Sequence, residues 1–335
     1  MKTRVFAILL VLVVASSLTF AQDSRPLILE HANAVNPQSD APGQARSQRP
    51  VELATLPQVD ITVLVENMAG GGPVLGEWGL SFLVETDRRR ILFDTGGGQT
   101  LLGNARSLGV DLSKIDAIVI SHGHDDHTGG LGKALEACGP VDFFVHPAAF
   151  TTRYWKEGSR AVPDVMPFSQ DQLRRLVRNL VETANSTSVC EGMMVTGQIP
   201  RLTNFEDTGV REFAFLDAEL KKPNPILDDQ ALFFRVPEGV VILLGCGHAG
   251  VVNTIRYVSE LVGGQKIYAV MGGSHLLNAS PLRLQKTIET FRKFDLQKIM
   301  LCHCTGIDAY AEIAKAFPGR SSWPACGTKV RFGGK

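Results

Sequence analysis

Short apolar runs separated by polar and turn residues recur in two long parts of the chain, and each part predicts short strands joined to helices. The first part opens with three β-branched runs separated by turn signals, which predicts an antiparallel meander. These runs are VDITVLVEN, GLSFLVET and RRILFDTG, within residues 59–96. A helix, a strand, a second helix and another strand should follow, at residues 99–109, 115–120, 131–138 and 141–147.

The second part repeats this mixture of strands and helices. Apolar runs predict strands at residues 231–236, 239–248, 266–273 and 298–303. Helical spacing predicts helices at residues 251–262 and 280–294. Strands and helices in both halves, without an internal repeat, indicate the α/β class and favour an αββα sandwich, two sheets with helices outside. An amidohydrolase barrel would need eight strand–helix units, which this order of elements does not offer.

A less regular stretch at about residues 151–227 interrupts the pattern and indicates an insertion. It contains one helix candidate, from Ser169 as N-cap to about Ala184, followed by Pro- and Gly-rich connections. We expect a cap of helix and loops that covers a site. The domain itself should span residues 58–335, preceded at residues 22–57 by a flexible linker rich in Pro, Gln, Ser and Ala.

Residues 1–21 have the pattern of a secretory signal peptide. Lys2 and Arg4 precede the apolar run Phe6–Ala15, and Thr19-Phe20-Ala21 offers small residues at a cleavage site. The apolar run is too short for a membrane span, although an uncleaved anchor is the alternative. We therefore expect an exported protein, periplasmic or secreted, without a stable membrane span after cleavage. N-terminal sequencing of the exported protein should start at Gln22, and an intact N-terminus would contradict cleavage.

The composition narrows the function classes. Of 335 residues, 44% are hydrophobic, and 34 basic side chains balance 34 acidic ones. The short basic run at residues 88–90 falls at a predicted hairpin turn, so nothing indicates nucleic-acid binding. A small-molecule substrate is the expected partner, and no pattern specifies an oligomeric state.

The six cysteines admit two interpretations, disulfides or metal ligands. Cys246, Cys302 and Cys304 stand beside histidines in Gly-rich or Thr-Gly contexts, which favours a metal site at least as strongly as a bridge. The remaining cysteines have no such context, and the sequence does not pair them.

The densest chemistry lies in SHGHDDHTGG, residues 121–130, between a predicted buried strand and a helix. Imidazole and carboxylate are ligands that zinc-like cations prefer. His122 and His124 stand two residues apart on an extended segment, so both rings can reach one ion. Asp126 and His127 follow near a helix start and can serve a second ion. Asp126 is also the candidate catalytic carboxylate.

Three further histidines each follow an apolar strand: His248 in LLGCGHAG, His275 in MGGSHLL and His303 in LCHCTG. Each alone fits a core or capping role as well as a site. Because open α/β folds build sites at the carboxyl ends of strands, their shared placement favours the site. His146 in FFVHPAAF is evenly balanced between the two roles, and His31 lies in the predicted linker.

The order and spacing of four motifs resemble the metallo-β-lactamase fold hydrolases across residues 59–330. The motifs are ILFDTG, SHGHDDHTGGL, LLGCGHAG and LCHCTG. A second set resembles one branch of that family, the 7,8-dihydropterin-6-methyl-4-(β-D-ribofuranosyl)aminobenzene-5'-phosphate synthases. That set comprises ENMAGGG, GEWGLSFLVET, LLGNARSLGVD, TGQIPR, GCGHAGVVN, GGSHLL and HCTG. Resemblance to this branch implies the scaffold more firmly than the reaction.

The resemblance implies two divalent metal ions, with zinc favoured and manganese or iron as options. The ligands it implies are His122, His124, Asp126, His127 and His303. It also implies that Asp94 orients the histidine loop. Two family positions differ here, since TGQIPR stands in place of a histidine and GCGH in place of the bridging aspartate. We infer that His248 supplies a missing ligand, with Cys246 as its competitor or partner.

Two cations sharing a water would support hydrolysis of an ester, lactone, amide or phosphoester, with no organic cofactor. Arg201 in TGQIPR and the backbone of GGGQT, residues 96–100, are candidates to hold an anionic substrate group, although each also fits a structural role. His275 is a further candidate near the substrate. The alternatives are the pterin-related synthase reaction of the branch, a metal-dependent anion-binding protein and a diiron oxidoreductase. Diiron members usually carry glutamate where this chain has His124, which disfavours the last alternative.

Overall fold

The computed structural model describes residues 50–334. The predicted signal peptide and most of the predicted linker lie outside the described residues. None of the described helices has the length and hydropathy needed to cross a membrane. All six cysteines lie within the described part, and all six are free thiols there, so the disulfide interpretation is not realised.

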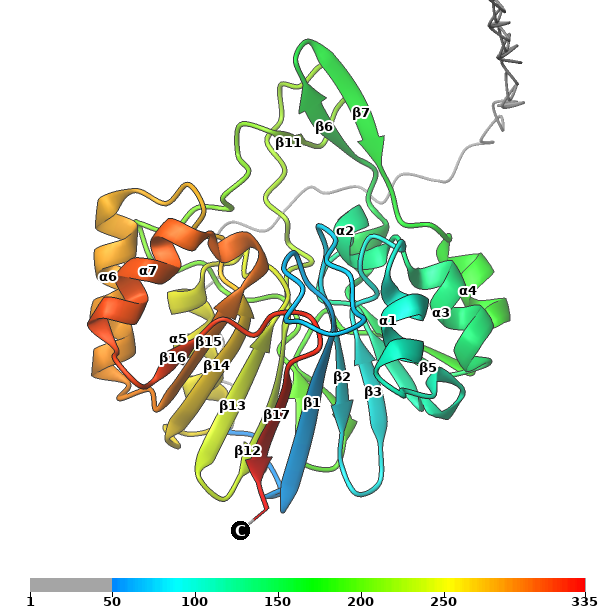
Figure 1. Cartoon of the computed structure of the whole chain (residues 1–335). Coiled ribbons are helices and arrows are strands. Elements are labelled where there is room, and N and C mark those ends of the chain that lie inside the picture. Colours follow the sequence, from blue (N-terminus) through cyan, green and yellow to red (C-terminus); the bar gives the residue numbers. More distant parts are fainter. Residues whose placement is uncertain (1–49, 335) are drawn as a thin grey trace, which may run out of the picture. The chain divides into compact units, whose positions relative to one another are not determined.

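The first sheet has seven strands in the order β17-β1-β2-β3-β4-β5-β8 (Figure 1). Their bounds are Gln58–Val65 (β1), Ser81–Glu85 (β2), Arg90–Phe93 (β3), Ala117–Val119 (β4), Asp142–Val145 (β5), Asn179–Glu182 (β8) and Lys329–Gly333 (β17). Strands β1, β2 and β3 pair antiparallel, which confirms the predicted meander. Strands β3, β4, β5 and β8 pair in parallel, so their carboxyl ends share one edge of the sheet.

The second sheet also has seven strands, in the order β16-β15-β14-β13-β12-β10-β9. Their bounds are Thr187–Cys190 (β9), Met193–Val195 (β10), Ala231–Val236 (β12), Gly239–Leu244 (β13), Ile267–Gly273 (β14), Lys298–Cys302 (β15) and Ser321–Ser322 (β16). Strands β12 and β13 form an antiparallel hairpin. Strands β13, β14 and β15 are parallel, so the loops that follow them leave from a common edge.

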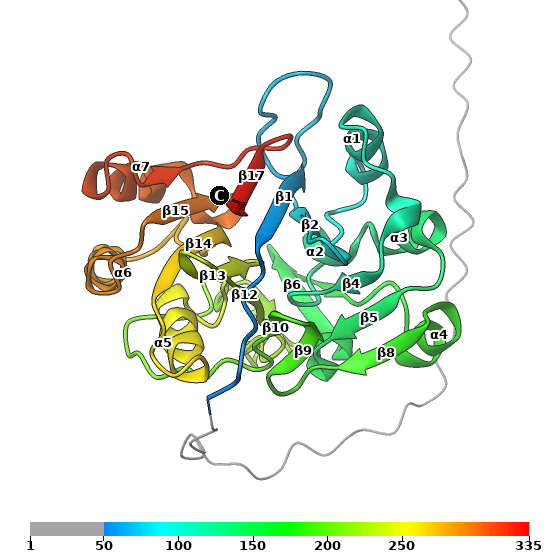
Figure 2. The same ribbon diagram turned by 90° about the horizontal axis from the view of Figure 1, so that it is seen from below.

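Helices cover the outer faces of both sheets, and Figure 2 shows the four layers from below. Helices α1, α3 and α4 lie beside the first sheet, and α5, α6 and α7 lie beside the second (Figure 2). The helices are Leu101–Ser107 (α1), Asp125–Thr128 (α2), Leu131–Cys138 (α3), Gln170–Leu176 (α4), Val251–Leu261 (α5), Pro281–Lys293 (α6) and Ile307–Ala316 (α7). Short 3-10 turns occupy Leu112–Lys114 (η1), Pro147–Phe150 (η2) and His303–Thr305 (η3). This arrangement confirms the predicted αββα sandwich.

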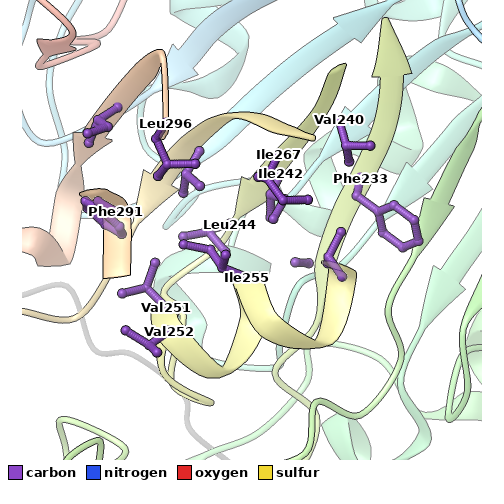
Figure 3. Close-up of a cluster of buried hydrophobic side chains, with 14 of the residues drawn as sticks. Phe233, Val240, Ile242, Leu244, Val251, Val252, Ile255, Ile267, Phe291 and Leu296 are labelled. Carbon is purple, nitrogen blue, oxygen red and sulfur yellow. The ribbon is translucent and has the colours of Figure 1, made fainter. Parts of the chain in front are cut away.

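Strand β13 shows why an uninterrupted apolar run suits this fold. Side chains alternate between the two faces of a strand. Val241 and Leu243 face the first sheet and join the core between the sheets. Ile242 and Leu244 belong instead to the core beneath α5, where Ile255 packs (Figure 3). A strand buried on both faces must be apolar at every position.

The inserted stretch contains more strand than the sequence predicts. Strands β6 (Arg153–Glu157), β7 (Arg160–Asp164) and β11 (Ala214–Phe215) form a small antiparallel sheet beyond one end of the sandwich (Figure 1). We call this small sheet the cap. The predicted helix starts at Ser169 as expected, with a capping box, but it ends at Leu176 instead of Ala184. The chain then becomes β8, because its backbone groups pair with the edge of β5.

The ordered domain begins before the expected boundary at residue 58. The Val51 N–H donates to the Leu261 carbonyl at 2.8 Å, and the Leu56 N–H donates to the Arg235 carbonyl at 2.8 Å. Leu53 and Leu56 are buried against the sandwich. These apolar contacts attach the last residues of the predicted linker to the domain, because burying leucine side chains is favourable.

Candidate metal centre

The histidine cluster lies where β4 ends and the short helix α2 begins. His122 and His127 are fully buried, and His124, which is 2% exposed, occupies the N-cap position of α2. The segments that follow β13, β14 and β15 bring Cys246, His248, His275 and His303 to the same region. Both sheets therefore contribute to one site at the end of the sandwich that carries the cap (Figure 1).

A first group of side chains joins His122, His124 and His248. The ring centroids of His122 and His124 are 4.5 Å apart, and each lies 4.8 Å from the centroid of His248. His122 Nε2 lies 3.0 Å from His124 Nδ1. His248 Nε2 is buried and has no hydrogen-bond partner among the described residues. His124 Nε2 is likewise buried without a partner among the described residues. Converging ring nitrogens, two of them without a partner, suit a cation that imidazole binds well.

A second group joins Asp126, His127, Cys246 and His303, whose candidate ligand atoms lie within 4.8 Å of one another. His127 Nε2 is 3.1 Å from the Cys246 sulfur, and His303 Nε2 is 3.2 Å from Asp126 Oδ2. The Cys246 sulfur also lies within 4.8 Å of candidate atoms of His122 and His248 in the first group. Cys246 therefore stands between the two groups.

Asp94 fixes the orientation of the histidine loop. Its carboxylate accepts hydrogen bonds at 2.7 Å from the Ser121 N–H and from the Ser121 hydroxyl. It also lies 2.7 Å from His127 Nδ1, which leaves His127 Nε2 directed into the second group. The Ser121 hydroxyl lies 2.9 Å from His122 Nδ1. One carboxylate thus orients a ring in each group, as supporting residues do around bound metals.

Two other ring orientations depend on residues distant in the sequence. Asn67 Oδ1 lies 2.9 Å from His303 Nδ1, and the buried Glu66 carboxylate accepts from the His303 N–H at 2.8 Å. The carbonyl of Thr208 lies 2.6 Å from His248 Nδ1. In both rings the Nδ1 atom is engaged, which leaves Nε2 for a ligand role. Sequence reasoning missed these partners, although ENMAGGG carries two of them.

Burial and neighbouring charges set the protonation of these groups. Burial lowers the pKa of His124 to about 3, and the Arg153 guanidinium adds to this effect. Burial also lowers the pKa of His248 well below its ordinary value. Burial opposes the protonation of His127, but two neighbouring carboxylates outweigh it and raise its pKa to about 9. Without a cation, the first group is thus neutral imidazole, the form that binds metals.

A buried ion pair supports the loop that carries His122 and His124. The Asp228 carboxylate accepts from the Gly123 N–H at 2.8 Å and from Arg153 Nη2 at 3.1 Å. Arg153 begins strand β6, so this pair connects the base of the cap to the histidine loop. The side chains of Asp228 and Asp229 are both buried. The adjacent Asp229 accepts from the Ala249 N–H at 2.7 Å.

The two candidate anion holders are engaged inside the protein. Arg201 donates to the carbonyls of His248, Pro225 and Ile226, so it supports the His248 loop instead of facing a substrate. The backbone of GGGQT does hold a carboxylate, but that carboxylate belongs to Glu77. The N–H groups of residues 98, 99 and 100 donate to Glu77 at 3.2, 2.8 and 2.9 Å. Both groups therefore have, in this structure, the structural role that the sequence also admitted.

Two further histidines, His275 and His146, differ in their position relative to the two ligand groups. His275 lies beside the first group, with its ring centroid 4.4 Å from that of His248, and its N–H donates to the Cys304 sulfur at 3.3 Å. Its backbone is in the left-handed region, with φ of 46°. His146 Nδ1 accepts from the Ala148 N–H at 3.1 Å, which is a capping role at η2.

A cavity of about 400 Å³ opens beside the two groups. Its lining includes Asp126, Cys246 and His248, together with residues of the cap. Four candidate ligands therefore border the cavity, and the two groups are open on that side: His124, Asp126, Cys246 and His248. A closed structural metal site has no such opening, whereas a catalytic one keeps it for water and substrate.

Comparison with known proteins agrees with this geometry. The sequence profile of the Metallo-beta-lactamase superfamily matches residues 79–264. A 7,8-dihydropterin-6-methyl-4-(beta-D-ribofuranosyl)-aminobenzene-5'-phosphate synthase of Methanocaldococcus jannaschii is 29% identical over 269 residues, which is 77% of this chain and 92% of that protein.

Solved structures give the same result. Tm1679, described as a metal-dependent hydrolase of the beta-lactamase superfamily, superposes with a TM-score of 0.69 at 27% identity, covering 81% of this chain and 98% of that one. The metallo-beta-lactamase fold protein YhfI of Bacillus subtilis has a TM-score of 0.51 at 12% identity, covering 82% of this chain and 99% of that one. The profile match, the sandwich and the strand-end cluster agree, and the chain belongs to the metallo-β-lactamase superfamily.

Proposed function

We propose that this chain is an exported, metal-dependent hydrolase that cleaves an ester, lactone or phosphoester. The observation that carries the proposal is the pair of ligand groups that meet at Cys246 beside an open cavity. The apolar leader pattern of residues 1–21 supports export. The similarity to a metal-dependent hydrolase structure supports the reaction class.

The residues present fit two divalent cations. His122, His124 and His248 would hold one cation, and Asp126, His127 and His303 would hold the other. Cys246 would be shared between them, so Cys246 and His248 would both be ligands. A set of imidazoles, one carboxylate and one thiolate favours zinc over magnesium or calcium. When bound, two such ions supply Lewis acidity and lower the pKa of water towards neutrality.

Asp126 is the chain's own candidate to accept the proton of the attacking water. Its side chain is 14% exposed and lines the cavity, so a substrate and a water can reach it. Burial opposes its ionisation, but His127 and His303 outweigh burial and keep its pKa below the ordinary value. Asp126 is therefore ionised at neutral pH, which a proton acceptor requires.

The similarity to the dihydropterin-related synthase favours a second candidate, a reaction on a phosphorylated pterin-type substrate. The same scaffold would then hold such a substrate over the two ligand groups. Two features of this chain disfavour that candidate. Arg201 and the GGGQT backbone, the candidates to hold an anionic substrate group, are hydrogen-bonded within the protein.

Isotopically labelled water tests the hydrolase proposal. Protein stripped with a chelator should be inactive, and addition of Zn²⁺ or Mn²⁺ should restore turnover on a panel of carboxylic esters, lactones, phosphodiesters and phosphomonoesters. Mass spectrometry should find one solvent oxygen in the product. Turnover that consumes dioxygen, or no turnover on any substrate after metal addition, would overturn the proposal.

A further inference from the structure

The walls of the cavity are predominantly apolar above its ligand-bearing floor. Five apolar side chains from four separate segments line it: Trp78, Trp155, Val210, Phe213 and Leu277. Three of these are large and about half exposed, with Trp78 at 56%, Phe213 at 50% and Leu277 at 51%. Apolar side chains that gather at the mouth of a cavity without a protein partner indicate a ligand that covers them.

Apart from the two proposed cations, the charged side chains that line the cavity are mainly acidic. Lys156 is the one cationic side chain in the lining, whereas Asp125, Asp126 and Glu157 contribute three carboxylates. Beyond the proposed cations, this lining offers a phosphate no bidentate arginine contact. Arg153, which lies near the histidine loop, is buried and paired with Asp228.

The groups that could have held an anion are already hydrogen-bonded within the protein. Arg201 donates to three backbone carbonyls, and the GGGQT amides bind the Glu77 carboxylate. Glu77 in effect occupies a preformed anion site with the protein's own carboxylate. The cavity therefore offers a substrate apolar contact and the two proposed cations, but few cationic side chains of the protein itself that could recognise an anion.

We propose that the substrate presents an uncharged apolar acyl or aryl group to this cavity, and that it is a hydrophobic carboxylic ester or lactone instead of a phosphomonoester. This inference rests on the proposed hydrolase function. In the reaction, the oxygen of water bonds to the acyl carbon and the bond from that carbon to the alcohol oxygen breaks. One proton of the water ends on the alcohol, and the other leaves with the acidic product.

A series of esters tests the inference through activity. With metal-loaded protein, kcat/KM should rise at least about tenfold from 4-nitrophenyl acetate to 4-nitrophenyl octanoate, because each buried methylene contributes favourably. Activity on 4-nitrophenyl phosphate should be at least about 100-fold lower than on the octanoate, given the missing bidentate contacts. Equal rates along the ester series, or a preference for the phosphate, would overturn the inference.

Variants of exposed residues locate the effect without endangering the fold. Phe213→Ala and Leu277→Ala should each lower kcat/KM for the octanoate about 5- to 20-fold and change that for the acetate less than about twofold, since only the longer chain reaches these walls. Leu282→Ala is the matched control, because Leu282 is 55% exposed on α6 and does not line the cavity. An equal loss in the control would assign the effect to something other than the cavity.

Binding of two related dyes tests the same inference without turnover. Uncharged N-phenyl-1-naphthylamine should bind at least about tenfold more tightly than its sulfonated analogue 8-anilinonaphthalene-1-sulfonate. Phe213→Ala should lower the affinity of the protein for the uncharged dye. If the dyes behave so but no ester is hydrolysed, the hydrolase function fails and the apolar site stands. If esters are hydrolysed but the sulfonated dye binds better, the hydrolase stands and the substrate class is wrong.

Discussion

Replacing Asp126 by asparagine is expected to lower kcat about 10²- to 10⁴-fold, the range for loss of a positioned proton acceptor. Asparagine keeps the size of the side chain but removes the negative charge and the basic oxygen. Asp126 Oδ2 lies 3.2 Å from His303 Nε2 and 3.7 Å from His127 Nε2, so the change falls within the second group. Steady-state kinetics on a hydrolysed ester, with metal content measured in parallel, gives the readout.

The neighbouring Asp125 provides the matched control. It is exposed at the start of α2 and belongs to neither ligand group. Asp125→Asn should keep kcat within about threefold of wild type, since a surface carboxylate interacts weakly. Circular dichroism should be the same for both variants and wild type. An Asp126→Asn protein that keeps two metals and full kcat would remove Asp126 from the reaction.

Purified protein is expected to hold close to two transition-metal ions per chain. His248→Ala should lose the ion of the first group, and His303→Ala should lose that of the second, so each should retain about one. Cys246→Ser should weaken both ions, because its sulfur lies within 4.8 Å of candidate atoms in both groups. Loss of a direct ligand should lower affinity by more than the about 10- to 100-fold typical of supporting residues.

Elemental analysis and competition with a chelator measure these effects. Asp94→Asn keeps every ligand in place and should lower affinity by only about 10- to 100-fold. His146→Ala is the control, since His146 is a buried histidine that caps η2 outside both groups. A single ion in wild type that persists in His303→Ala would contradict the two-ion arrangement.

The sandwich could be predicted because its signals are local. Alternating side chains along β1 and β2, and runs buried on both faces such as β13, specify which segments lie in a core. The first four candidate ligands could also be predicted, because the HxHxDH motif places them within six residues. The end of α4 could not be predicted, because residues Asn179–Glu182 form a strand by pairing with the edge of β5. That competition depends on a partner 37 residues away.

The sequence by itself determined the αββα class, the histidine loop and the strand-end positions of His248, His275 and His303, since each rests on periodicity or on close spacing. Only the tertiary structure decided which residues these side chains and backbone groups contact. It placed Glu66 against the His303 backbone across 237 residues, and Cys246 between the two ligand groups. It also directed the Glu77 carboxylate to the GGGQT amides, which removed an anion site that the local sequence offered. Such pairings satisfy buried polar groups through contacts distant in the chain, and no local pattern encodes the partner.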